Sequence, residues 1–236
     1  MPSSAEGLLD ELIAANVLEL STDGERLELS EGFRETVERR STAVADAGEA
    51  TLRREIEAVT TGTRAEDRDV LVDVGASDPA FVAKYLGVQE RVRDRPIDEV
   101  VRLVFLVDQF VSSPPSDGVP DGFLPIHHGH VGTAIRLCRL GVVYVWRRDC
   151  PPCDRVREHF EAIFPDGSED VSLFAVYGPA YAESLRDEYD VGGAPTTLFV
   201  GNGAIDSRLV GAHARETFER EVRNVKAVVE GTRVER

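Results

Sequence analysis

The stretch of sequence that decides the fold is VVYVWRRDCPPC, residues 142–153. Its first five residues are β-branched or aromatic, follow Gly141 and predict a short, fully buried strand. Beyond the two cysteines, apolar residues recur at helical spacing, at Val156, Phe160, Ile163 and Phe164. Cys150 and Cys153 are therefore expected where a strand passes into a helix. At a helix N-terminus, unpaired N–H groups and the helix dipole favour a thiolate, so we expect Cys150 to be the nucleophile.

Composition limits the class of protein. With 236 residues, 42% of them hydrophobic, the chain can form one large or two modest domains with true cores. Its formal net charge is -16 and its pI is near 4.7. Because phosphate binding needs concentrated Lys and Arg, the sequence argues against nucleic acid as a partner, and equally against anionic membranes.

The basic residues are unusual in kind. Lys84 and Lys226 are the only two lysines, so 25 of the 27 basic residues are arginine. Together with the excess of Asp and Glu and a single Met, this composition resembles that of proteins from extreme halophiles that accumulate salt. In that setting we interpret the charge runs as solvated surface.

The sequence carries no sign of export or of a membrane span. Residues 1–6 lack the basic region and apolar core of a signal peptide, and the longest apolar run, 100–107, is interrupted by Arg102. Three cysteines cannot form a disulfide framework, and CxxC in a cytosolic protein more often serves redox or metal chemistry. A soluble cytoplasmic protein is expected.

Residues 1–111 predict a mainly helical N-terminal domain that contains a β-hairpin. Alternating apolar residues surround an Asp-Gly turn within residues 17–29, and Ser30 is placed to cap the helix that follows. A helix, a hairpin and a helix in this order resemble part of a winged-helix module. Because residues 1–60 hold 14 acidic and 6 basic side chains, we expect a protein-interaction or structural role for this domain rather than DNA binding.

Helix signals continue to the end of this domain. Thr63 with Glu66 forms a capping-box pattern at the start of a helix that Gly75 is expected to end, and Ser77 or Asp78 with Pro79 is expected to start the next helix. Residues 96–111 are apolar almost all round, which predicts a helix at the centre of a small bundle.

Residues 112–122, SSPPSDGVPDG, predict a linker, because Ser, Pro and Gly dominate them. After it the pattern alternates between short apolar runs and amphipathic segments. Strands are expected at 142–146, 171–177, 196–200 and 204–210, and helices at 131–140, after Cys150, from Pro179 and before the C-terminus. Residues 123–236 therefore predict an α/β domain whose sheet closes with a hairpin.

Over roughly residues 125–236 the chain resembles the thioredoxin family. The motifs that agree in order and spacing are Trp146 four residues before the first cysteine, CPPC opening a helix, Ala194-Pro195-Thr196 opening a strand, and Gly211 after the final hairpin. The resemblance implies a thioredoxin-like fold, with a central mixed sheet flanked by helices.

The resemblance also implies a thiol-disulfide oxidoreductase. Cys150 would attack a disulfide of a protein substrate, and Cys153 would resolve the mixed disulfide. Pro195 would be cis, a form that costs little at proline. It would place Ala194 against the cysteines, and Ala194, Pro195 and Trp146 would contact substrate. No cofactor would be needed beyond the redox-active disulfide of Cys150 and Cys153. Since there is no dinucleotide fingerprint, a separate electron donor is expected.

The intervening prolines bear on the direction of the reaction. Pro151 and Pro152 have no N–H, so the Cys150 sulfur is expected to rely on the amide of Cys153 and on the helix dipole. This predicts a thiolate less stabilised than in strong oxidants, and hence a reductase or a balanced exchanger.

Two residues depart from the family pattern. Tyr144 stands where many thioredoxins bury an Asp, and Asp149 stands where they have a Trp. Both are candidate proton-transfer or tuning residues, and because tyrosine is a poor base at neutral pH, resolution by Cys153 is expected to be slow or to use a water.

Two other interpretations of the motif remain open. The thioredoxin-like domain could act as a non-enzymatic adaptor for protein binding. Alternatively, the cysteines could join His127, His128 and His130 in a mixed Cys/His zinc site. In the main interpretation, no bound metal is expected. Cys138 is expected to be a buried core thiol, with a regulatory redox role as its alternative.

Overall fold

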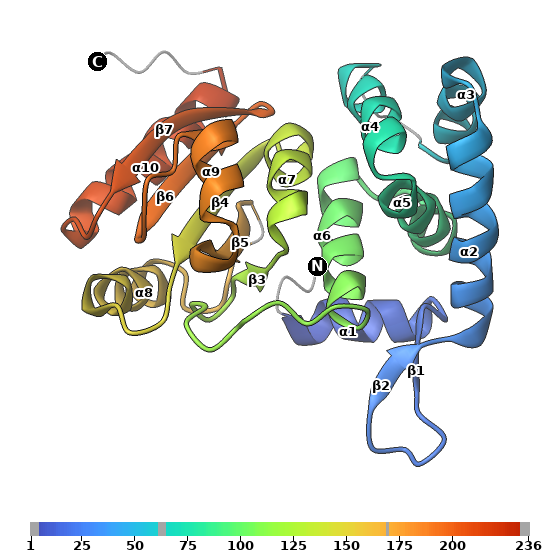
Figure 1. Cartoon of the computed structure of the whole chain (residues 1–236), viewed down its shortest axis with the longest axis horizontal. Helices are drawn as coiled ribbons and strands as arrows, with labels where there is room; N and C mark the ends of the chain where they lie inside the picture. The colour runs from blue at the N-terminus through green and yellow to red at the C-terminus, as the bar shows by residue number, and fades with distance from the viewer. Residues whose placement is uncertain (1–4, 61–64, 169, 232–236) are drawn as a thin grey trace. The chain divides into compact units, whose positions relative to one another are not determined.

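The computed structural model describes residues 5–60, 65–168 and 170–231. The chain divides into two compact units, Ala5–Ser112 and Ser113–Arg236 (Figure 1). Among the helices of the described residues, none combines the length and the apolar character that crossing a membrane requires.

The first unit consists of helices and one hairpin. Its elements are α1 (Ala5–Ala14), β1 (Leu18–Leu20), β2 (Leu27–Leu29), α2 (Glu31–Asp46), α3 (Glu49–Val59), α4 (Ala65–Ser77), α5 (Pro79–Val92) and α6 (Ile97–Gln109). The predicted hairpin is confirmed, because β1 and β2 pair antiparallel with Leu18 opposite Leu29. Most residues of α6 are buried, as its apolar sequence predicted.

Local sequence explains where two of these helices begin. The Ser30 hydroxyl accepts the Phe33 N–H at 3.2 Å, and the Asp78 carboxylate accepts the Phe81 N–H at 2.9 Å. Both side chains satisfy amides that lack a partner within the first turn. The predicted capping box at Thr63 lies outside the described residues.

The expectation that Gly75 ends a helix was wrong. Helix α4 continues to Ser77, and Gly75 is buried within it against Leu52 of α3. A Cβ at Gly75 would lie 2.6 Å from the Leu52 side chain. This glycine is therefore explained by close helix packing and not by a helix end.

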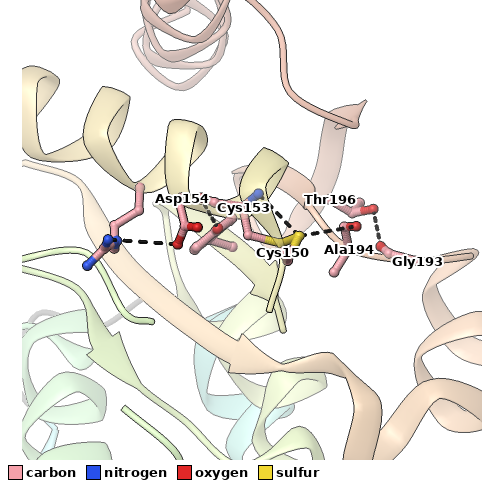
Figure 2. The surroundings of a disulfide bond; sticks show 8 residues. Cys150, Cys153, Asp154, Gly193, Ala194 and Thr196 are labelled. Atoms are coloured by element: carbon pink, nitrogen blue, oxygen red, sulfur yellow. Dashed lines mark hydrogen bonds and ion pairs between the residues drawn. A yellow bond between two sulfur atoms is a disulfide. The ribbon is translucent and has the colours of Figure 1, made fainter. Parts of the chain in front are cut away.

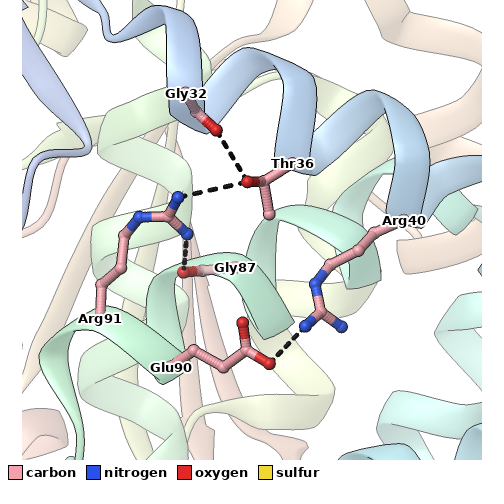
Figure 3. Close-up of polar contacts among 6 residues, drawn as sticks. All are labelled: Gly32, Thr36, Arg40, Gly87, Glu90 and Arg91. Carbon is pink, nitrogen blue, oxygen red and sulfur yellow. Dashed lines mark hydrogen bonds and ion pairs between the residues drawn. The ribbon is translucent and has the colours of Figure 1, made fainter.

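Helices α2 and α5 approach closely and are tied by polar side chains (Figure 3). Arg91 donates to the Gly87 carbonyl at 2.9 Å and to the Thr36 hydroxyl at 3.3 Å, while Arg40 pairs with Glu90. These contacts fix the register of two helices that are distant in sequence.

The second unit holds a five-stranded sheet. Its elements are β3 (Leu124–Pro125), η1 (His128–His130), α7 (Val131–Leu137), β4 (Leu140–Trp146), α8 (Pro151–Ile163), β5 (Ser172–Tyr177), η2 (Gly178–Tyr181), α9 (Ala182–Tyr189), β6 (Thr196–Gly201), β7 (Ala204–Val210) and α10 (Arg215–Val229). The strand order is β3-β5-β4-β6-β7. Strands β3, β5 and β4 run parallel, and β6 and β7 are antiparallel to their neighbours.

Helices cover both faces of this sheet (Figure 1). On one face, Val156 and Phe160 of α8 and Phe218 of α10 pack in a buried cluster with Tyr144. Helices α7 and α9 lie over the other face. The predicted α/β class, a mixed sheet flanked by helices and preceded by a helical region with a hairpin, is confirmed.

Candidate functional site

The cysteine pair lies where the sequence predicted it, at the junction of β4 and α8. Cys150 is the N-cap residue of α8, and Pro151 and Pro152 form its first turn. A disulfide joins Cys150 to Cys153, with 5.2 Å between their Cα atoms (Figure 2). The two residues are buried, 3% and 4% exposed, so only a small edge of the pair is open to a reactant.

The main-chain amide of Cys153 donates a hydrogen bond to the Cys150 sulfur, as expected. Its N–H donates to Cys150 Sγ at 3.2 Å, and the next amide, of Asp154, donates to the Cys150 carbonyl at 3.1 Å. Neither Pro151 nor Pro152 can donate. The sulfur therefore lies at the positive end of the helix dipole with this one amide directed at it.

The loop before β6 lies against the cysteines. The Ala194–Pro195 peptide bond is cis, as the resemblance implied, and Cys150 Sγ lies 4.0 Å from the Ala194 carbonyl oxygen. Thr196 donates its hydroxyl to the Gly193 carbonyl at 2.6 Å (Figure 2), and the N–H of Gly211 donates to the Pro195 carbonyl at 2.8 Å. The loop is thus held from both sides beside the disulfide.

Tyr144 and Asp149 occupy different environments. Tyr144 is fully buried, and its hydroxyl donates to the Cys153 carbonyl at 2.9 Å. Burial, with a smaller contribution from Asp154, raises the pKa of Tyr144, so the phenol is neutral at physiological pH. Asp149 is exposed and has a left-handed backbone, with φ of 52°.

Trp146 is covered by the segment that the sequence predicted to be a linker. Its side chain is 1% exposed, and a Cβ at Gly118 would lie 2.4 Å from the indole ring. Next to this contact, Asp117 accepts two hydrogen bonds from Arg148, at 2.7 and 3.0 Å, and these bonds lower the pKa of Asp117. Residues 117–118 therefore belong to the immediate surroundings of the site.

The three histidines of the suggested zinc site gather around a tyrosine. His127 Nε2 and the Tyr181 hydroxyl share a hydrogen bond of 2.8 Å, and the His128 ring stacks on Tyr181 with 3.5 Å between centroids. Within the described ranges, no three His, Cys, Asp or Glu side chains gather in a way that could hold a metal ion. The structure does not bring the histidines and the cysteine pair into one cluster.

Cys138 is buried, 1% exposed, at the C-terminal cap of α7. It lies outside the Cys150–Cys153 disulfide, in agreement with the expected core position, although at a helix end and not within a helix.

Comparisons with known proteins give matches among solved structures. No family model matches the sequence, and no curated protein matches it. Among solved structures, thioredoxin from Malassezia sympodialis is 21% identical, with a TM-score of 0.39 over 46% of this chain and 96% of that one. A mutant thioredoxin from Halobacterium salinarum is 14% identical, with a TM-score of 0.38 over 48% and 94%. Spinach chloroplast thioredoxin f is 12% identical, with a TM-score of 0.39 over 43% and 91%.

The fold class rests on the topology itself. A mixed sheet, a helix that begins at CPPC between the adjacent parallel strands β4 and β5, and a cis-proline that opens β6 are the features that the resemblance implied. The second unit has this thioredoxin-like fold.

Sequence reasoning missed two parts of the site. One is the contact of Gly118 with Trp146, and the other is a pocket beside Ala194 that Arg147 helps to line. Both join segments distant in sequence, so no local pattern could have indicated them.

Proposed function

We propose that this protein is a thiol-disulfide oxidoreductase that acts on disulfides of protein substrates. The observation that carries the proposal is the Cys150–Cys153 disulfide at the N-terminus of α8, with the Ala194 carbonyl 4.0 Å from Cys150 Sγ. A helix N-terminus favours the thiolate that such chemistry needs, and the loop at Ala194 offers main-chain groups to an extended substrate segment.

The reaction follows from the positions of the two sulfurs. In the reduced protein, the Cys150 thiolate attacks one sulfur of the substrate disulfide, and the other substrate sulfur leaves as a thiolate. The Cys153 thiolate then attacks Cys150 Sγ and releases the second substrate sulfur. The substrate takes up two electrons and two protons, and the protein is left with the Cys150–Cys153 disulfide.

We further propose that the protein works as a reductase or a balanced exchanger. The single amide directed at Cys150 Sγ supports this, because fewer donors stabilise the thiolate less. A separate cytoplasmic dithiol donor would return the pair to its reduced form. The N-terminal domain, residues 1–111, would bind a protein partner, since side chains such as Leu20, 64% exposed, offer apolar surface.

The test is reduction of insulin disulfides by dithiothreitol, with and without the full-length protein. The wild type should accelerate the reaction, and Cys150→Ser should return it to the uncatalysed rate. Cys138→Ser is the matched control, because Cys138 is buried away from the disulfide, and it should retain the wild-type rate. Equal rates for the wild type and Cys150→Ser would remove the proposal.

A non-enzymatic binding role is the second candidate. The 3% exposure of Cys150 favours it, because a buried sulfur is difficult for a protein disulfide to reach. The same assay separates the two functions, since an adaptor gives no acceleration in any of the three proteins.

A further inference from the structure

A pocket of about 340 Å³ lies on the α9 side of the sheet, and Ala194 of the loop beside the cysteines forms part of its wall. The end of β4, helix α9 with the turn before it, and the loop that leads to Pro195 form its walls. Val145, Leu185, Val191 and Pro179 make the pocket largely apolar. Its volume suits one apolar side chain with part of the backbone on either side of it.

The pocket shares one wall residue with the loop that contacts the disulfide. Ala194 lines it, and the carbonyl oxygen of the same residue lies 4.0 Å from Cys150 Sγ (Figure 2). A substrate segment that presents its disulfide to Cys150 along this loop therefore places a neighbouring side chain at the pocket.

One charged residue stands in the pocket wall. Arg147 is exposed, and every other lining residue is Val, Leu, Ala, Gly or Pro. The neighbouring Arg148 forms an ion pair with Asp117, and the Arg157 guanidinium lies 3.8 Å from the Asp154 carboxylate. Over the described residues, Arg147 has no hydrogen bond and no ion pair. In a chain of net charge -16, this is an uncompensated cation at the edge of an apolar pocket.

We propose that this pocket is a specificity site for acidic substrate segments. It takes an apolar side chain next to the reacting cysteine, and Arg147 pairs with a nearby Asp or Glu of the same segment. The guanidinium suits this role because its planar fork matches a carboxylate and stays charged at every physiological pH. The substrate class is therefore protein disulfides flanked by an apolar and an acidic residue. This inference rests on the proposed function.

The test compares peptide disulfides that are identical except for one residue. Each carries Leu beside the cysteine, followed by Glu, Gln or Lys, and the rate of reaction with the reduced full-length protein is measured. The neutral bis(2-hydroxyethyl) disulfide serves as a substrate that is too small and uncharged to use the pocket. The wild type should prefer the Glu peptide over the Lys peptide by about fivefold at low salt, the range expected of an exposed ion pair. Salt should reduce this preference.

Three variants assign the preference to its residue. Arg147→Gln should abolish it, and Arg147→Glu should reverse it in favour of the Lys peptide. Arg155→Gln removes the same charge from an exposed position on α8 outside the pocket wall, and it should leave the preference intact. The rate of each variant with the neutral disulfide normalises its peptide rates, because a change of charge near Cys150 also alters the reactivity of the thiolate.

The possible outcomes distinguish failure of the specificity site from failure of the proposed function. Exchange with the neutral disulfide but equal rates for the three peptides would overturn the specificity site alone. A preference lost equally in Arg155→Gln would also overturn it, because the effect would then be long-range charge. No exchange with the neutral disulfide would overturn the proposed function and this inference with it.

Discussion

The hydroxyl of Tyr144 donates a hydrogen bond to the carbonyl of Cys153, 2.9 Å away, from a fully buried position below the first turn of α8. Its proton is thus directed at the main chain, and burial raises the pKa of the phenol. The structure therefore favours a positioning role for Tyr144 over the proton-transfer role considered from the sequence.

Tyr144→Phe tests this assignment. Loss of one buried hydrogen bond should lower the free energy of unfolding by about 1 kcal/mol, measured by urea denaturation. The rate of disulfide reduction should stay within about twofold of the wild type, with an unchanged pH profile. A fall of tenfold or more with a shifted profile would show that the phenol transfers the proton.

Asp149→Asn should make Cys150 more reactive. Asp149 directly precedes Cys150, and its negative charge opposes the formation of the thiolate. Asn tolerates the left-handed backbone at φ of 52°, so the substitution removes charge without adding strain. Alkylation of reduced Cys150 by iodoacetamide near pH 6 should be about two- to threefold faster, on the order expected of one exposed charge. An unchanged rate would mean that solvent screens Asp149 fully.

Gly118→Ala should disturb the cover of Trp146. The added Cβ would lie 2.4 Å from the ring, so the segment around Gly118 must shift, at a cost of about 1–3 kcal/mol. Trp146 is the single tryptophan, and its fluorescence reports directly on the contact. We expect emission at longer wavelength and stronger quenching by acrylamide.

Gly192→Ala is the control for this change, because no atom lies within 4 Å of the position of its Cβ. It should leave the fluorescence unchanged. Identical quenching of Gly118→Ala and the wild type would contradict the close contact.

His128 gives the stability a pH dependence. Burial, and secondarily His127, lowers the pKa of His128, so the unfolded chain binds this proton more tightly than the folded one. The contribution of His128 to the free energy of unfolding is complete above the pKa of this side chain in the unfolded chain, about 6.5. It is lost as the pH falls through the lower pKa of the folded protein. His128→Phe keeps a ring stacked on Tyr181 and should reduce the difference in urea midpoint between about pH 7.5 and about pH 5.

The control is His159→Phe, a substitution on α8 away from His127, His128 and Tyr181. It should keep the wild-type difference in urea midpoint between the two pH values. If His128→Phe loses as much stability on acidification as the wild type, other groups carry the effect.

Local patterns predicted most of the fold. The buried run of β4, the Asp-Gly hairpin and the caps Ser30 and Asp78 all depend on residues within a few positions of one another. Strand β3 was missed because it has two residues, one of them Pro125, and exists only through its pairing with β5. Such an element has too little sequence to form a pattern.

The site was predicted only in part, for the same physical reason. The position of Cys150 follows from its own strand and helix, whereas the contact of Gly118 with Trp146 depends on tertiary packing. The same holds for Arg147, whose place in a pocket wall depends on α9 and on the loop before Pro195. Gly75 shows the converse case, because its packing against Leu52 overrode a local signal for a helix end.

The central claim is that Cys150 attacks the substrate and Cys153 resolves the intermediate. Intact-protein mass spectrometry tests it most directly, after the reduced full-length Cys153→Ser and Cys150→Ser variants are each mixed with a disulfide peptide. The account predicts that Cys153→Ser retains one peptide, bound to Cys150, and that Cys150→Ser retains none. Equal labelling of both variants, or a peptide bound to Cys138 in each, would contradict it.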